Sequence, residues 1–327
     1  MLRRSLIALA SLAVIAVAGL AGAIAFGTKA APPPLASLGA GSVAIGRELA
    51  DLPPALRFTA RDGTALAYRA YPASPDRIVI IIHGSSGSSA AVHGFAKALQ
   101  AAGITVYAPD IRGHGQSGRK GDVEYIGQLE DDLIDLLAAL GSAPAAAKRI
   151  LVGHSSGGGF VLRVAGGPTG DRFDGYLLLA PYLSHDAPTV RPNAGGWAAP
   201  YVPRIIALAI LGRFGLHWFE GLPVVAFGIP PQEMSANRTA FYSFRLWANF
   251  APHRDWQGDI RNIRRPAMVL VGANDELFRA DQYAPVFKAL RQDIPVELVP
   301  NLDHMEITTT PEGRAATIKA FGVLSAR

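Results

Sequence analysis

The sequence contains no cysteine among its 327 residues, and this absence removes several classes of chemistry. Disulfide bonds, thiolate nucleophiles and cysteine-ligated zinc sites all require the thiol side chain. The eight histidines also lack the H-E-x-x-H spacing of a helical zinc site. We therefore expect neither a metal site nor thiol chemistry. The lack of cysteine does not indicate the cellular compartment of the protein.

Charged residues make up only 17% of the chain, and the basic excess is spread along it. The formal net charge is +5, and the basic residues gather only at Arg261, Arg264 and Arg265. A nucleic-acid surface needs a basic stripe, often with interleaved aromatic residues, and neither is visible. We expect no nucleic-acid partner, while the positive charge favours an anionic membrane surface.

A nucleotide-binding loop is also missing. The glycine- and serine-rich loop at 83–89 is not followed by a Walker-type lysine. Residues 113–118 match G-x-G-x-x-G, but residues 119–122 intervene before the next helical pattern and no strand-end acid follows at the usual distance. We therefore expect no cofactor.

The first long feature that is present is an uncharged apolar stretch from Ser5 to Phe26. Its 22 residues suffice to cross a hydrocarbon layer of ~30 Å. Arg3 and Arg4 precede it and Lys29 follows, which favours a cytoplasmic start and an exported catalytic domain, periplasmic or extracellular. The stretch is either a retained anchor or, with cleavage near residues 21–23, a signal segment that yields a secreted form.

Beyond this stretch, apolar runs typical of strands alternate with helical spacing. The strand-like runs are 77–82, 104–109, 149–152, 175–181, 267–271 and 296–300, and the helical patterns lie at 92–99 and 126–140. This alternation predicts an α/β fold, a mostly parallel sheet with helices on both faces. Residues 56–60 and 66–71, joined by an Asp-Gly turn, predict an antiparallel hairpin at the edge.

The run at 149–152 leads into Gly153-His154-Ser155-Ser156-Gly157, a G-x-S-x-G pattern. In a strand-to-helix elbow the central serine has strained backbone angles, and larger side chains at the glycines would collide with neighbouring elements. Ser155 is therefore the candidate nucleophile.

A serine nucleophile needs an imidazole base and a carboxylate that orients the base. Asp275 follows the strand-like run 267–271, and His304 follows the run 296–300. The order Ser, acid, His and the position of each at a strand end predict that Ser155, Asp275 and His304 converge. Glu276 and Asp281 compete with Asp275 for the role of the acid.

The loop at 83–89 directs backbone N–H groups towards the same edge of the predicted sheet. We assign the oxyanion hole to the amides of Ser85 and Ser156. Loss of one such donor typically costs ~3 kcal/mol of transition-state stabilisation.

These motifs resemble the α/β-hydrolase superfamily, and within it the monoacylglycerol lipase and lysophospholipase branch. The resemblance is carried by His83-Gly84, the R-G-H-G-x-S segment at 112–117, the elbow, Asp275 and His304. It covers residues 56–182 and 252–327. The segment Ser86-Gly87-Ser88-Ser89 and Ser156 replace residues common in that branch, which leaves the reaction class intact and the substrate open.

The segment 183–251 differs in character, because its 69 residues hold 11 of the 27 aromatic residues. We expect an inserted, largely helical cap that lines an acyl pocket or touches lipid, although a small cap also needs aromatic residues for its own core. The predicted organisation is a membrane segment with a proline-rich linker at 1–34, a catalytic domain at 35–182 and 252–327, and this cap.

The predicted function is hydrolysis of carboxylic esters, on single-chain lipids such as monoacylglycerols or lysophospholipids, through an acyl-enzyme at Ser155. The same residues also suit a short-chain esterase, an amidase or a cofactor-free perhydrolase. A binding protein on a hydrolase scaffold is the alternative without catalysis. The expected partners are an ester or lipid substrate and a membrane, and the sequence leaves the oligomeric state open.

Overall fold

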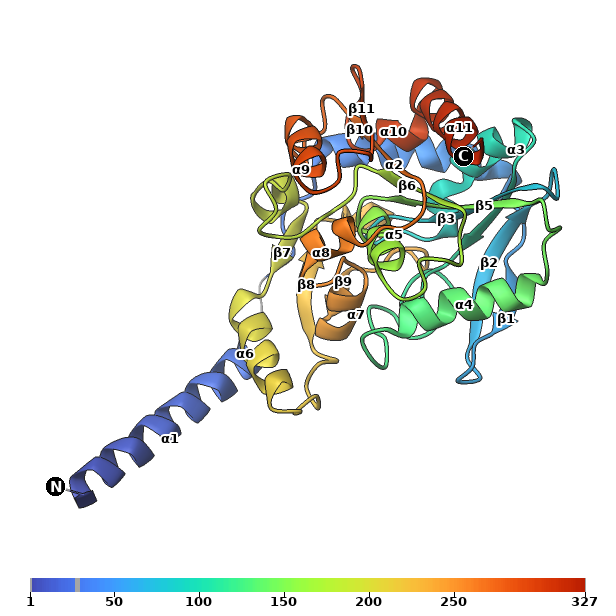
Figure 1. The fold of residues 1–327 in the computed structure, drawn as a ribbon. Helices are drawn as coiled ribbons and strands as arrows, with labels where there is room; N and C mark the ends of the chain where they lie inside the picture. The colour runs from blue at the N-terminus through green and yellow to red at the C-terminus, as the bar shows by residue number, and fades with distance from the viewer. Residues whose placement is uncertain (1, 27–29, 327) are drawn as a thin grey trace.

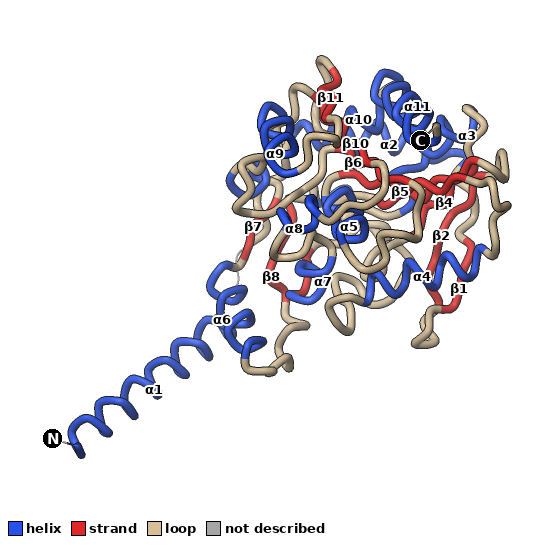
Figure 2. Tube along the Cα trace, in the orientation of Figure 1, coloured by secondary structure: helices blue, strands red, loops and turns tan. Residues whose placement is uncertain are grey.

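An eight-stranded sheet forms the centre of the computed structural model, which describes residues 2–26 and 30–326 (Figures 1 and 2). Lys29, used above in the charge argument, lies outside the described residues. The strands run in the order β1-β2-β4-β3-β5-β6-β10-β11. Their bounds are β1 Leu56–Thr59, β2 Ala65–Tyr71, β3 Arg77–Ile82, β4 Thr105–Pro109, β5 Lys148–His154, β6 Gly175–Leu179, β10 Ala267–Gly272 and β11 Val296–Val299.

The predicted strand pairing is confirmed. β1 and β2 form the antiparallel hairpin at one edge, with Leu56 opposite Tyr68, and β2 also pairs antiparallel with β4. The remaining pairs are parallel, from β4 through β11. The carboxyl ends of the parallel strands therefore meet at one edge, where open α/β sheets bind their ligands.

Helices cover both faces of the sheet, because the central strands are apolar on both sides. In β3, Ile80 and Ile82 pack into one core cluster and Val79 and Ile81 into the other. The first cluster is covered by α4 Gln128–Leu140, α5 Ser156–Gly166, α8 Trp256–Arg261 and α9 Tyr283–Leu290. The second is covered by α3 His93–Ala101, α10 Glu306–Thr309 and α11 Pro311–Ser325.

The segment 183–251 leaves the main sheet after β6 and contains its own elements. Its helices are α6 Val202–Arg213 and α7 Phe244–Asn249, and three short strands form a separate antiparallel sheet, β7 Ala198–Pro200, β8 Pro223–Phe227 and β9 Phe241–Ser243. Helical residues outnumber strand residues in the insertion, as expected, but the sequence did not indicate its small sheet. Strands of three to five residues are too short to leave a recognisable alternating pattern.

Two helices precede the sheet. α1 Leu2–Phe26 includes the predicted apolar stretch and extends away from the rest of the molecule (Figure 1). α2 Ala36–Glu48, which the sequence did not indicate, packs against α3 and α10. Arg314 on α11 binds both carboxylate oxygens of Glu48 at 2.8 Å, which fixes the end of α2 to the catalytic domain.

Candidate active site

Ser155 lies between the end of β5 and the first residue of α5, at the carboxyl edge of the sheet. Its φ of 57° and ψ of −122° are strained for a residue with a side chain, as the elbow predicts. A Cβ on Gly157 would lie 2.4 Å from the carbonyl oxygen of His83, and one on Gly153 would lie 2.3 Å from that of Gly157. The two glycines are therefore a steric requirement, and the backbone strain presents Ser155 in a fixed place.

His304 and Asp275 meet at the same edge, although 29 residues separate them. His304 Nδ1 lies 2.8 Å from Asp275 Oδ2, and both side chains are almost completely buried. The other oxygen of Asp275 accepts hydrogen bonds from the backbone N–H groups of Leu277 and Phe278, at 2.9 and 2.7 Å. The carboxylate is therefore held in one orientation, and it faces the imidazole.

The two competing acids have other positions. Glu276 Oε2 accepts a hydrogen bond from the backbone N–H of His304 at 3.0 Å, and Asp281 is exposed. Of the three carboxylates that follow β10, only Asp275 bonds the His304 ring.

Charge interactions at this pair favour an ionised Asp275 beside a basic His304. Burial by itself lowers the pKa of His304, but the Asp275 carboxylate and its hydrogen bond outweigh burial and raise the pKa above its usual range. Burial raises the pKa of Asp275, and the His304 ring together with the two backbone N–H groups reverses this and lowers it. An imidazole with a raised pKa is a stronger general base.

Ser155 and His304 line one pocket, together with Ser85 and His154. Within the described residues, no hydrogen bond joins Ser155 Oγ to His304 Nε2. Catalytic hydrogen bonds of this kind are often long in unliganded enzymes and tighten only with substrate. The structure thus pairs the predicted acid and base directly and brings the predicted nucleophile into their pocket.

The predicted oxyanion loop lies against the nucleophile. A Cβ on Gly84 would lie 3.4 Å from Ser155 Cβ, and the side chain of Ser85 lines the pocket. Ser156 opens α5, so its N–H is among those at a helix start that lack an intrahelical acceptor. Both assigned amides therefore belong to segments beside Ser155.

Two cap residues hold this loop, a role that the sequence did not indicate for either of them. Trp197 Nε1 donates a hydrogen bond to Ser85 Oγ at 2.9 Å. The backbone N–H of Ser86 donates to the Tyr242 hydroxyl at 2.8 Å, and that hydroxyl lies 2.7 Å from His114 Nε2. Burial holds the pKa of His114 well below its usual range, and Nδ1 of this neutral ring faces the carbonyl oxygens of Ile111 and Arg112, so Nε2 accepts the proton of the Tyr242 hydroxyl.

His154 is a second residue whose place emerges only in the fold. Its Nε2 lies 3.0 Å from the carbonyl oxygen of His304, and the two rings are 4.7 Å apart. Burial lowers the pKa of His154 to about 3, so the ring is neutral and Nε2–H donates to that carbonyl. Glu276 and His154 therefore hold the two backbone polar groups of His304.

Helix α2 forms one wall of the pocket, opposite the sheet. Leu38, Ser42 and Ile45 line it, and a Cβ on Gly41 would lie 2.7 Å from Met305 Cβ. The cap adds Glu233 and Arg238 to the lining, and Arg238 binds Ser42 Oγ of α2 at 2.6 Å and Glu233 at 2.5 Å. Apolar side chains with one localised polar cluster suit an amphiphilic ligand.

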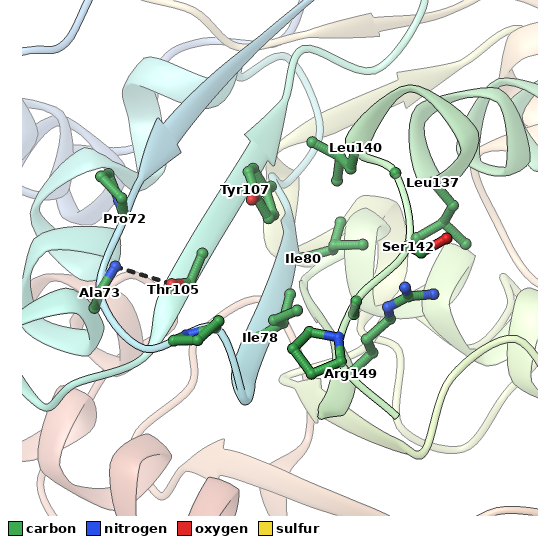
Figure 3. Close-up of a pocket in the computed structure, with 14 residues that line it drawn as sticks. Pro72, Ala73, Ile78, Ile80, Thr105, Tyr107, Leu137, Leu140, Ser142 and Arg149 are labelled. Carbon is green, nitrogen blue, oxygen red and sulfur yellow. Dashed lines mark hydrogen bonds between the residues drawn. The ribbon is translucent and has the colours of Figure 1, made fainter. Parts of the chain in front are cut away.

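A separate hollow lies at the amino ends of the parallel strands (Figure 3). It is lined mainly by apolar side chains, among them Ile78, Ile80 and Leu140, with Arg149 at its rim. None of its 14 lining residues is a histidine, aspartate or glutamate, so it lacks the groups for hydrolytic chemistry. Among the described residues there is also no cluster of three or more side chains suited to holding a metal ion.

Comparison with known proteins agrees with this architecture. The family described as "Serine aminopeptidase, S33" matches residues 73–220, which include the elbow. The chain has the α/β-hydrolase fold. The chain is 29% identical over 251 residues to a monoacylglycerol lipase of Mycolicibacterium smegmatis, and the aligned residues make up 73% of this chain and 84% of that protein.

Two solved α/β-hydrolase structures share the fold. A monoacylglycerol lipase of Paleococcus ferrophilus superposes with a TM-score of 0.60 at 21% identity, over 80% of this chain and 98% of its own. A bacterial membrane phospholipase A superposes with a TM-score of 0.58 at 18% identity, over 99% of both chains. The second match therefore extends beyond the catalytic domain to the N-terminal helices.

Proposed function

We propose that this α/β-hydrolase cleaves carboxylic esters through an acyl-enzyme at Ser155. One observation carries the proposal: His304, which is paired with the buried carboxylate of Asp275, lines the same pocket as a serine on a strained elbow. A hydroxyl beside a basic imidazole with a raised pKa is the arrangement that serine hydrolysis needs.

The proposed reaction has two halves. His304 Nε2 takes the proton of Ser155 Oγ as that oxygen bonds the ester carbonyl carbon, and Asp275 stabilises the resulting imidazolium. The amides of Ser85 and Ser156 donate to the oxyanion, and the alcohol leaves with the proton from His304. Water then repeats the sequence on the acyl-enzyme, which releases the carboxylic acid and restores Ser155.

We propose single-chain lipid esters, such as monoacylglycerols or lysophospholipids, as substrates. The apolar lining from Leu38, Ile45 and Leu277 supports an acyl chain, and the polar cluster around Arg238 supports a hydroxylated or zwitterionic head group. The similarity to a monoacylglycerol lipase and the fold shared with a membrane phospholipase A support the same substrate class.

We further propose that α1 stays attached as an anchor, with the catalytic domain on the exported side. Buried Arg204 on α6 donates from Nε to the carbonyl oxygen of Ile24 at 2.8 Å. A cation at a helix C-terminus stabilises that end. Such a contact supports a retained helix, because a signal segment that is removed contributes nothing to the mature fold.

A fluorophosphonate probe tests the chemistry. We expect labelling of the wild type and none of Ser155→Ala, because the probe needs an activated serine. A folded wild type that fails to label would favour a binding protein on a hydrolase scaffold. An ester panel from acetyl to long-chain monoacylglycerol then tests the substrate, and a sharp preference for the acetyl ester would reject the lipid assignment while leaving the mechanism.

Amide hydrolysis is the second candidate, favoured by the aminopeptidase description of the matching family. Esters and amides share the tetrahedral intermediate, and they differ in the protonation of the leaving group. Two substrates with the same acyl group, one an ester and the other an anilide, distinguish esterase from amidase activity through the ratio of their kcat/KM values.

A further inference from the structure

A stripe of exposed apolar side chains runs along α6, directly beside the end of α1. Val202, Ile206 and Ile210 follow one another at intervals of four residues, which places them on one face of the helix. Ile206 is 54% exposed, whereas Ala207 and Leu208 on the other side are buried. Helix α6 therefore keeps an exposed apolar face, while its other side packs against the rest of the cap.

The turn after α6 extends this apolar surface with aromatic residues. Phe214 and Trp218 are 76% and 80% exposed, the highest values among the aromatic side chains of the cap, and Phe219 is also exposed. Full exposure of such side chains to water is costly, and a contiguous group of them marks an interaction site. Tryptophan and phenylalanine beside an apolar helix face are typical of the membrane interface.

The packing of α6 on α1 fixes where this surface lies relative to a bilayer. The described residues of α1 that are partly covered, Leu20 and 22–24, belong to its last two turns. In Figure 1, α6 lies beside the C-terminal end of α1, where α1 meets the rest of the molecule. At 1.5 Å per residue the stretch Ser5–Phe26 spans ~33 Å, against ~30 Å of hydrocarbon, and its last two turns fill the outer ~10 Å.

The contact between the two helices is anchored by a buried charge. Arg204 is 4% exposed, and besides the carbonyl of Ile24 it binds the carbonyl oxygen of Pro223 on β8 at 2.8 Å. Three elements are thus joined through one guanidinium group. The catalytic domain is therefore held to α1 at one orientation, with the apolar face of α6 at the depth where α1 leaves the hydrocarbon.

We infer that the apolar face of α6 and the turn 214–219 form a second membrane-contacting element, which inserts into the leaflet that α1 exits. Amphipathic helices bury their apolar face about 5–10 Å into the headgroup and acyl boundary, which matches the depth set by the last turns of α1. Strand β7 alone separates α6 from Trp197, which lines the catalytic pocket. Docking of α6 thus brings the pocket to the lipid surface.

This inference rests on the proposed role of α1 as an anchor, and the absence of cysteine makes it directly testable. Ile206→Cys and Trp218→Cys each provide a unique labelling position for an environment-sensitive fluorophore. Ala139→Cys, exposed on α4 away from α1, is the matched control. The full chain is placed in phosphatidylcholine and phosphatidylglycerol nanodiscs, with or without a doxyl quencher near the head group.

For labels at positions 206 and 218 we expect blue-shifted emission and about twofold quenching by the doxyl lipid, because α6 and the turn after it reach the acyl boundary. For the label at position 139 we expect neither effect, because α4 does not reach that boundary. Labels at 206 and 218 that resemble the control would overturn the inference. Blue-shifted labels that doxyl lipid does not quench would also overturn it, because another protein surface, such as a second copy of the chain, then covers the face.

An activity measurement separates this inference from the proposed chemistry. Ile206→Asn combined with Trp218→Ser is expected to lower turnover of monoacylglycerol in vesicles about fivefold, since a reoriented domain presents the pocket poorly. Turnover of a water-soluble short-chain ester stays unchanged. Equal loss on both substrates would contradict docking, and a wild type without activity on either would reject the proposed function while the labelling result stands.

Discussion

Asp275 reaches His304 because backbone N–H groups of the turn after β10 hold its carboxylate. The sequence placed Asp275, Glu276 and Asp281 after the same strand and had no means to rank them, because a side chain's direction depends on the turn that follows. The fold directs the first towards the imidazole ring, the second towards the backbone N–H of His304 and the third into solvent. All three side chains are carboxylates, and only their orientation gives them different roles.

The raised pKa of His304 predicts the pH profile of the reaction. A general base acts when neutral, so kcat/KM falls as pH decreases through the pKa of His304 in the free enzyme. Because that pKa lies above the usual 6.5, we expect half-maximal kcat/KM on the acid side above pH 6.5. A profile of kcat/KM on a water-soluble ester from pH 5 to 9 measures the midpoint.

Asp275→Asn provides the control for this assignment. Removal of the carboxylate leaves burial as the main influence on His304, and burial lowers its pKa. We expect kcat to fall about 10⁴-fold, the loss typical of this change in a serine triad, and the acid midpoint of the residual activity to move to lower pH. A midpoint that stays in place would show that Asp275 does not set the pKa of the base.

At the scale of elements, α2 is the feature that sequence patterns could not reveal. Its residues are mostly small, with three glycines that lower helix propensity, so neither periodicity nor propensity indicates a helix. The helix is fixed by tertiary contacts, through Met305 at its middle and Arg314 at its end. It thereby becomes a wall of the pocket.

Two glycines of α2 allow a matched test of that wall. A Cβ on Gly41 would overlap Met305 Cβ, whereas one on Gly39 meets nothing within 4 Å. We expect Gly41→Ala to displace α2 and to lower kcat/KM about tenfold on long-chain esters, with a smaller effect on acetyl esters, since a misplaced pocket wall weakens substrate positioning. Gly39→Ala should leave both values unchanged and raise stability by ~0.5–1 kcal/mol.

The comparison of the two variants uses kcat/KM on each ester and thermal unfolding. Equal kcat/KM values for Gly41→Ala and the wild type on long-chain esters would show that α2 does not shape the acyl site.

On the scale of the whole molecule, the N-terminal helix is bonded to the cap. Arg204 ties α1 to α6 and β8, and the linker carbonyl of Pro33 would lie 2.9 Å from a Cβ on Gly228. The arrangement contrasts with a flexible tether, which would leave the orientation of the pocket towards the membrane undefined.

This arrangement predicts how the chain partitions in cells. A retained 22-residue span is expected to stay in the membrane fraction after high salt and alkaline carbonate and to require detergent for release. The intact mass of the purified chain should include residues 5–26. A soluble product that begins near residue 24 would show instead that the segment is a cleaved signal.

The sequence by itself determined where the main strands of the sheet lie along the chain, the elbow, and the identity of the candidate nucleophile and base, because those depend on local periodicity and on steric demands at single positions. The hairpin at 56–71 follows from the same local rules. So does the start of helix α11, where the side chain of the N-terminal capping residue Thr310 accepts a hydrogen bond from the backbone N–H of Gly313. Only the tertiary structure decided which carboxylate faces His304, that Tyr242 and Trp197 hold the oxyanion loop, and that α2 closes the pocket. These features depend on side-chain directions and on contacts between residues up to 266 positions apart, as between Glu48 and Arg314, which a local pattern does not encode.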